Sequence, residues 1–80
     1  MSRPIDAVLD LRGVRCPMNY IKTKLKLEEL VDGQVLELWI DDGEAIRGIP
    51  MGLRDEGHAV LITEAAQPGY RVVVKKGGAS

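Results

Sequence analysis

The sequence of 80 residues contains one cysteine, one histidine, one tryptophan, two tyrosines and no phenylalanine. A single thiol cannot form an internal disulfide or a CxxC redox pair, and it cannot supply a four-ligand zinc cage. With so few aromatic side chains, the core has to be built from valine, leucine and isoleucine. Because the chain also lacks metal-ligand clusters, a glycine-rich phosphate loop and a paired-carboxylate site, we expect no metal and no cofactor.

The sequence also has no large excess of charge of one sign and no long apolar run. Eleven Lys+Arg against twelve Asp+Glu give a formal net charge of −1, which argues against the strongly basic surface of a nucleic-acid-binding protein. No segment approaches the ~20 apolar residues that span a bilayer, and the first residues carry no signal-peptide pattern. We therefore expect a cytoplasmic protein with no membrane partner and no direct nucleic-acid partner.

The length and composition predict one folded domain, residues 1–80. Hydrophobic residues make up 45% of the chain and charged residues 29%, which is ordinary for a globular protein. Residues 76–80 contain two glycines and no apolar anchor apart from one alanine. We predict that this segment is a frayed tail.

Glycine, proline and aspartate residues divide the chain into predicted elements. Pro17 suits the first position of a helix, which Asp32-Gly33 ends. Pro50 disfavours helical geometry in the residue before it, so the second helical segment is predicted in two pieces. The predicted strands cover residues 8–11, 35–40, 59–63 and 70–75, one helix covers 17–31, and a loose helical turn at 44–48 precedes a short helix at 50–56.

The predicted first helix has a broad apolar half, which we expect to face the core. The spacing of residues along the sequence divides this helix into two apolar stripes and a polar side. One stripe contains Met18, Ile21 and Leu25, the adjacent stripe contains Tyr20, Leu27 and Val31, and the polar side contains Asn19, Lys22, Thr23, Lys26 and Glu29.

The order of elements predicts the fold class. Strand–helix–strand at the start implies a right-handed crossover and a parallel strand pair. The last two strands, joined by a turn at residues 67–69, form an antiparallel hairpin. A four-stranded mixed sheet with both helices on one face buries both helices at once. We therefore predict an α+β protein, a two-layer sandwich of order βαβαββ.

Cys16 falls where the first strand passes to the first helix. The unpaired N–H groups and the dipole of a helix N-terminus favour an anion there, and Arg12 and Arg15 add positive charge nearby. A thiol in this setting is expected to have a lowered pKa and to react as the thiolate. The alternative is a small buried hydrophobic residue, the usual role of an unpaired cysteine. The loop position and the flanking arginines favour the reactive thiol.

A lone reactive thiol limits the possible chemistry. Hydrolysis by a cysteine nucleophile needs a base nearby, normally histidine, and the one histidine, His58, is predicted to begin a strand. Disulfide chemistry needs a second cysteine. A persulfide carrier needs one exposed thiolate that takes sulfur from a donor and passes it to an acceptor.

Residues 9–17, Leu-Asp-Leu-Arg-Gly-Val-Arg-Cys-Pro, resemble the LDxxGxxCP signature of the TusA/SirA-like small sulfur-carrier proteins. Residues 41–43, 47–50 and 71–78 are similar to the acidic turn, the later proline and the last strand of that family. The resemblance implies a βαβαββ sandwich whose single cysteine relays persulfide sulfur. It also implies a cysteine desulfurase or other protein donor, a protein acceptor, and a place in tRNA thiolation, molybdenum cofactor assembly or sulfur oxidation.

The resemblance also assigns roles around the thiol. Cys16 would carry the persulfide, with Arg12, Gly13, Arg15, Pro17 and Asn19 in support. The family motif is usually Cys-Pro-x-Pro, and Asn19 stands where the second proline would be. Asn19 either relaxes the rigidity of that turn or contacts the thiol or a partner. Because we expect its N–H to be unbonded, proline should be tolerated there.

The remaining expectations concern partners. We expect a partner-binding surface that contains Met18, Lys22, Lys26, Asp41 and Asp42, because complementary charge steers protein encounters. The alternatives are that the lysines form a solvated face balanced by neighbouring glutamates, and that the aspartates simply end a strand. The rival functions are a non-catalytic binding or regulatory module of the same fold, and nucleic-acid binding through the lysines.

Overall fold

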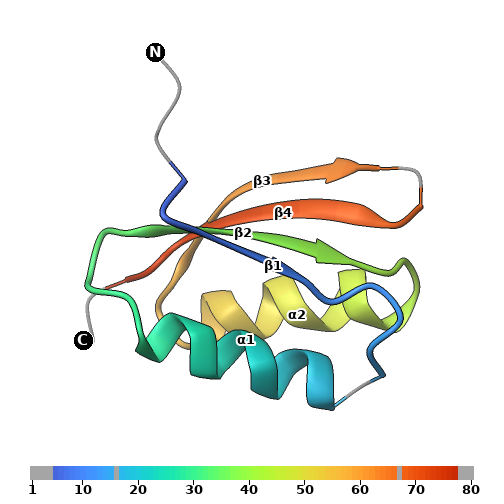
Figure 1. Ribbon diagram of the computed structural model, residues 1–80, viewed down its shortest axis with the longest axis horizontal. Helices are drawn as coiled ribbons and strands as arrows, with labels where there is room; N and C mark the ends of the chain where they lie inside the picture. Colours follow the sequence, from blue (N-terminus) through green and yellow to red (C-terminus); the bar gives the residue numbers. More distant parts are fainter. Residues whose placement is uncertain (1–4, 16, 67, 78–80) are drawn as a thin grey trace.

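The computed structural model describes residues 5–15, 17–66 and 68–77, and the predicted order βαβαββ is confirmed. A four-stranded sheet lies above two helices, so the molecule has two layers (Figure 1). The elements are β1 (Ala7–Asp10), α1 (Met18–Glu28), β2 (Val35–Ile40), α2 (Glu44–Asp55), β3 (Ala59–Ala65) and β4 (Tyr70–Lys75).

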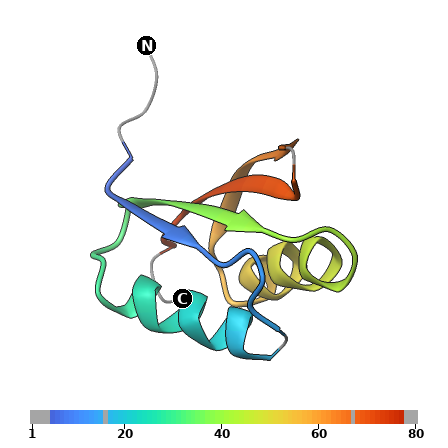
Figure 2. The same ribbon diagram turned by 45° about the vertical axis from the view of Figure 1, so that its right-hand side comes forward.

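The sheet has the strand order β1-β2-β4-β3. β1 runs parallel to β2, with Ala7 opposite Leu36 and Asp10 opposite Trp39. β4 is antiparallel to both β2 and β3. Both helices cover the same face of the sheet, as the turned view shows (Figure 2). The predicted mixed sheet, parallel first pair and antiparallel hairpin are therefore confirmed.

The core lies between the sheet and the helices and is aliphatic, as the scarcity of aromatic residues predicts. Tyr20 and Tyr70 pack against it only as partly buried side chains. Burial of these aliphatic groups supplies most of the stabilising free energy. The buried cluster consists of Leu11, Leu27, Leu36, Leu38, Ile40, Ala45, Ile49, Leu53, Val72 and Val74.

The strands at 35–40 and 70–75 are predicted correctly, whereas the two edge strands differ at their ends. β1 begins and ends one residue earlier than predicted; Leu11 follows it but is still buried, and its N–H donates to the Trp39 carbonyl at 2.7 Å. β3 extends two residues further and contains a bulge between Val60 and Ile62. Pairing with β4 extends it, which local turn signals do not reveal. Gln67 lies outside the described residues.

The second helical segment is one continuous helix, α2, and not the two pieces predicted around Pro50. Proline removes one N–H donor and strains the preceding turn, but it does not exclude helix where packing compensates. Ala45, Ile49 and Leu53 recur every four residues and are all buried against the sheet. This buried stripe outweighs the local preference at Pro50.

The first helix differs from the prediction in which side it buries. α1 begins at Met18, with Pro17 in the capping position just before it, and ends at Glu28. Its buried residues are Asn19, Thr23 and Leu27. Met18, Ile21 and Leu25, expected in the core, are 47%, 42% and 55% exposed, while Val31 lies outside the helix and is also exposed.

The polar residues on the buried side of α1 are internally satisfied. The Thr23 hydroxyl donates to the Asn19 carbonyl at 2.9 Å, and the Asn19 side-chain oxygen accepts from the Tyr20 N–H at 2.7 Å. A buried polar group that is hydrogen-bonded loses little on leaving water. Burial of Asn19 and Thr23 is thus compatible with a stable core, and the larger apolar side chains remain on the open face.

The described part of the C-terminal segment is held in place, which corrects the prediction of a tail frayed from residue 76. The Lys76 N–H donates to the Gln34 carbonyl at 2.8 Å, and its ammonium donates to the Leu30 carbonyl at 2.6 Å. The Gly77 N–H donates to Nδ1 of His58 at 3.1 Å. His58 therefore anchors this segment. Residues 78–80 lie outside the described residues.

We predict that Leu27→Ala lowers the free energy of unfolding by about 2–5 kcal/mol, because it opens a cavity beneath α1. Leu25→Ala, the matched change on the exposed side of the same helix, should shift it by less than ~0.5 kcal/mol. Urea unfolding of the two variants measures both values. Equal losses would mean that α1 buries the broad apolar half that its sequence suggests.

Candidate functional site

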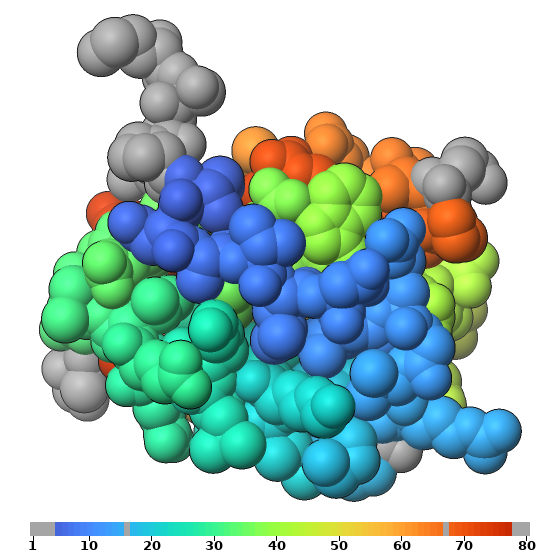
Figure 3. All heavy atoms as spheres, viewed as in Figure 1, coloured from blue at the N-terminus to red at the C-terminus, as the bar shows by residue number. Residues whose placement is uncertain are grey.

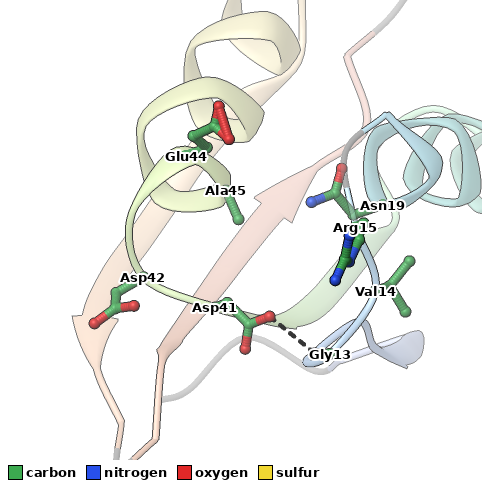
Figure 4. Close-up of a pocket in the computed structure, with 8 residues that line it drawn as sticks. All are labelled: Gly13, Val14, Arg15, Asn19, Asp41, Asp42, Glu44 and Ala45. Carbon is green, nitrogen blue, oxygen red and sulfur yellow. Dashed lines mark hydrogen bonds between the residues drawn. The ribbon is translucent and has the colours of Figure 1, made fainter.

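The candidate site forms where two loops leave neighbouring strands. Because β1 and β2 are parallel, their carboxyl ends meet at the same edge of the sheet. The Gly13 N–H, in the loop after β1, donates to a carboxylate oxygen of Asp41, just after β2, at 2.8 Å (Figure 4). Gly13 has a φ of +86°, a conformation that glycine adopts without strain. This bond joins the loop of Cys16 to the acidic turn.

A pocket of about 510 Å³ lies between these two loops (Figure 4). It brings together several of the residues that the sequence singles out. It is lined by Gly13, Val14, Arg15, Asn19, Asp41, Asp42, Glu44 and Ala45.

A second pocket of about 300 Å³ lies alongside, between α1 and α2. It shares three lining residues with the first, and its other walls are mainly apolar. It is lined by Pro17, Asn19, Tyr20, Glu44, Ala45, Gly48, Ile49 and Gly52.

Cys16, the predicted persulfide residue, lies outside the described residues. Its two neighbours in the chain are both exposed and both line a pocket, Arg15 the first and Pro17 the second. The residues on either side of Cys16 in the sequence therefore line different pockets. Nothing in the described residues contradicts the assignment of sulfur chemistry to this loop.

The two arginines near Cys16 are placed differently. The Arg12 guanidinium binds the Asp10 carboxylate at 2.9 Å and lies 5.2 Å from the centre of the Trp39 ring. The hydrogen bond from Arg12 lowers the pKa of Asp10 to about 2, and the same bond raises the pKa of Arg12. The charge of Arg12 is thus already paired at the outer face of the sheet, while Arg15 lines the pocket.

Acidic side chains predominate in the first pocket. Asp41, Asp42 and Glu44 line it against the single cation of Arg15. The sequence predicts the two aspartates as partner-binding residues, but it does not single out Glu44. The signal for Glu44 was its position directly after the acidic turn, where α2 begins. The net negative charge of the pocket opposes the positive surroundings expected for a thiolate.

Asn19, which replaces the second proline of the motif, is 3% exposed. Its backbone N–H donates to the Arg15 carbonyl at 3.1 Å, which corrects the expectation that this N–H is unbonded. Proline here would remove that bond. The side-chain amide nitrogen points into the pocket (Figure 4), and no buried side-chain nitrogen or oxygen of the described residues lacks a hydrogen-bond partner.

The lysines of α1 are mostly paired. Lys24 lies 3.4 Å from Glu56, and Lys26 lies 3.4 Å from Glu29. Within the described part of the chain, Lys22 makes no ion pair. The alternative of a solvated face balanced by neighbouring glutamates therefore applies to Lys24 and Lys26.

The other end of the second pocket is closed by a hydrogen-bonded pair. The Tyr20 hydroxyl donates to the Glu56 carboxylate, and the Tyr20 ring packs against Gly52. Partial burial and the neighbouring Glu56 raise the pKa of Tyr20 to about 12, while the hydrogen bond from Tyr20 lowers the pKa of Glu56. This pair fixes the spacing between α1 and α2.

Two further properties bear on function. No group of three or more His, Cys, Asp or Glu side chains in residues 5–15, 17–66 and 68–77 is arranged to hold a metal ion. Across the same residues, no helix has the length and apolar character needed to cross a membrane.

Comparison with known proteins identifies the family. The sulfurtransferase TusA family matches residues 7–76. A candidate sulfur carrier protein of Archaeoglobus fulgidus is 44% identical over 78 residues, which cover 94% of this chain and 89% of the relative. Similar candidate carriers occur in Methanocaldococcus jannaschii (37% identical; 85% and 91% covered) and Thermotoga maritima (33%; 89% and 91%). These matches support a sulfur-carrier role, and the chain belongs to the TusA sulfurtransferase family.

Proposed function

We propose that this protein carries sulfur as a persulfide on Cys16, between a donor protein and an acceptor protein. The observation that carries the proposal is the family match over residues 7–76, which includes the only cysteine of the chain. The location of Arg15 and Pro17 at two adjoining pockets supports it, because sulfur exchange needs room for a second protein's cysteine beside the thiol.

The proposed transfer balances without an external oxidant. The Cys16 thiol loses its proton to solvent, and the thiolate attacks the outer sulfur of the donor's persulfide. A new S–S bond forms on Cys16, the donor's S–S bond breaks, and the donor cysteine leaves as a thiolate that takes a proton from water. The acceptor's thiolate repeats the same step on the Cys16 persulfide.

Local groups act on the Cys16 thiolate in opposite directions. The N-terminal end of α1 and the cation of Arg15 favour it, whereas Asp41, Asp42 and Glu44 oppose it. The N–H groups of Asn19 and Tyr20 are bonded to Arg15 and to the Asn19 side chain, so neither is free to bind an anion. Among the residues that line the first pocket, Arg15 is the one cation that would favour a thiolate.

The exposed side of α1 supports docking of a protein partner. Met18, Ile21 and Leu25 form an apolar stripe that begins two residues after Cys16. α1, in teal, lies open along the lower part of the molecule (Figure 3). Lys22 adds positive charge beside this stripe. An apolar stripe next to a charge is typical of a surface that meets other proteins.

A non-catalytic binding module is the second candidate function. Asn19 favours it, because the residue that usually stiffens the reactive turn is absent and a buried amide occupies its place. The two functions differ in one measurable property, the ability of Cys16 to take up sulfur.

We predict that Cys16→Ser abolishes persulfide loading by a cysteine desulfurase supplied with cysteine. The gain of one sulfur atom, detected by mass spectrometry of the intact protein, measures loading. The free energy of unfolding should change by less than ~0.5 kcal/mol, because a loop residue makes few buried contacts. A large loss of stability would show a structural thiol, and an unloaded wild-type protein would favour the binding module.

We also predict that Cys16 reacts with iodoacetamide with a pH midpoint below the ~8.5 of a free thiol. Arg15→Gln should slow the reaction at pH 6.5, and Asp42→Asn should accelerate it. Each change should be roughly twofold, because the interaction of two unit charges through water is worth only about 0.5–1 kcal/mol. A wild-type midpoint at ~8.5 would contradict activation of the thiol by its surroundings.

A further inference from the structure

The side of α1 that faces away from the sheet is apolar. With 3.6 residues per turn, Met18, Ile21 and Leu25 fall opposite the buried residues of this helix, and they are 47%, 42% and 55% exposed. We call these three residues the outer stripe. α1 lies open along the lower part of the molecule (Figure 3). Contact of the outer stripe with another apolar surface would remove these side chains from water and is therefore favourable.

Charged residues border the outer stripe on both sides. Lys22 and Glu29 are seven residues apart, so they share one side of the helix. Lys24 and Glu28 are four residues apart and share the other side. On each side, the lysine lies toward the start of α1 and the glutamate lies at its end.

This order of charges is unfavourable for a helix on its own. The peptide dipoles leave partial negative charge at a helix C-terminus, which favours cations there and disfavours anions. α1 has no acidic residue in its first turn, whereas Glu28 is its last residue and Glu29 is its C-cap. Lys26 lies 3.4 Å from Glu29, but Glu28 makes no ion pair within the described residues. A cation from outside the molecule would therefore stabilise this end of α1.

A second copy of α1, running in the opposite direction, supplies that cation. When a two-fold axis relates two antiparallel helices, each side of the stripe lies against its own copy. Lys22 of each molecule then lies beside Glu29 of the other. Lys24 lies beside Glu28 in the same way. A parallel pair would instead bring Lys22 beside Lys24 and set the glutamates together.

Both ion pairs require nearly the same alignment of the two helices. The midpoint of residues 22 and 29 is 25.5, and the midpoint of residues 24 and 28 is 26. Both midpoints fall within one residue of Leu25, which is the most exposed member of the outer stripe. The alignment that pairs the charges therefore also places Leu25 against its own copy, with Ile21 beside the Leu25 of the other molecule.

We propose that this protein forms a weak homodimer through the outer stripe of α1, with the two helices antiparallel and Leu25 at the two-fold axis. The occupant is a second copy because a foreign helix would need two cations and two anions at matching positions, which an identical helix has by symmetry. α1 has 11 residues and is about 16 Å long, so the contact is smaller than the ~800 Å² per partner of a stable complex. The dimer is therefore transient.

Self-association would limit access to α1. The outer stripe is the surface on which a partner protein docks under the proposed function, so dimerisation and partner binding exclude one another. At high concentration, the dimer lowers the fraction of the protein that is available to partners. The homodimer itself does not depend on the sulfur chemistry.

Sedimentation equilibrium of the wild-type protein, kept reduced, measures self-association. We expect a dissociation constant of roughly 0.1–0.5 mM. Leu25→Ser should raise it about tenfold, because this change removes the apolar contact at the axis. Leu61→Ser, the matched change at an exposed leucine of β3, should leave it unaltered.

Charge exchange tests the complementarity of the two helices. Lys22→Glu and Glu29→Lys should each weaken the dimer several-fold, because each sets like charges together at two symmetric contacts. The double variant Lys22→Glu/Glu29→Lys should return to within about twofold of wild type. High salt should reduce the differences among these proteins.

Disulfide trapping in the Cys16→Ser protein tests the direction of the helices. Leu25→Cys should cross-link to its own copy on oxidation. Met18→Cys should not, because seven residues on either side of the axis separate its two copies by about 21 Å, which is beyond the reach of a disulfide. A parallel pair would cross-link both variants.

Four results would overturn the inference. A wild-type protein that stays monomeric at ~1 mM would show that the outer stripe does not pair with itself. Unchanged association of Leu25→Ser would place the contact elsewhere. Failure of the double charge variant to recover would contradict the pairing of Lys22 with Glu29. Equal cross-linking of Met18→Cys and Leu25→Cys would contradict the antiparallel direction.

Discussion

The parallel pairing of β1 with β2 is the constraint on which the rest of the structure depends. It requires a crossover, which α1 provides, and it brings the loop of Cys16 and the acidic turn to the same edge of the sheet. The Gly13–Asp41 hydrogen bond then joins the two loops directly. Without this pairing, the arginine, asparagine and carboxylates of the first pocket would not share one surface.

The arrangement of elements was predictable because its signals are local. Glycine at the turns, and apolar runs between them, mark where each strand and helix begins and ends. The orientation of α1 was not predictable in the same way. From its sequence, the apolar stripe of Met18, Ile21 and Leu25 could equally well be the buried side of α1. Only the hydrogen bonds of Thr23 and Asn19 make the opposite side compatible with the core. Whether buried polar atoms find hydrogen-bond partners depends on the fold and not on the spacing of residues in the sequence.

The candidate site, like the fold, could be predicted from the sequence only in part. Sequence analysis places the thiol, Arg15 and Asp41 in two loops, and the topology brings those loops together. It does not foresee that Arg12 turns away to bind Asp10, because the Trp39 ring over which Arg12 also lies comes beside Asp10 only through the pairing of β1 with β2. It also cannot foresee the second pocket, since a space between two helices depends on which of their faces meet. Gly48 indicates weak helix propensity in the sequence, whereas in the structure it marks free space beside α2.

The bulge in β3 has a consequence for how this protein behaves in a crowded solution. β3 lies at an edge of the sheet, and Leu61 and Ile62 are 41% and 42% exposed. A regular apolar edge strand presents evenly spaced backbone groups on which another chain can add a strand and begin an aggregate. The register shift between Val60 and Ile62 breaks that spacing at the centre of the strand. The bulge therefore hinders the addition of a strand from another chain at the edge of the sheet that β3 forms.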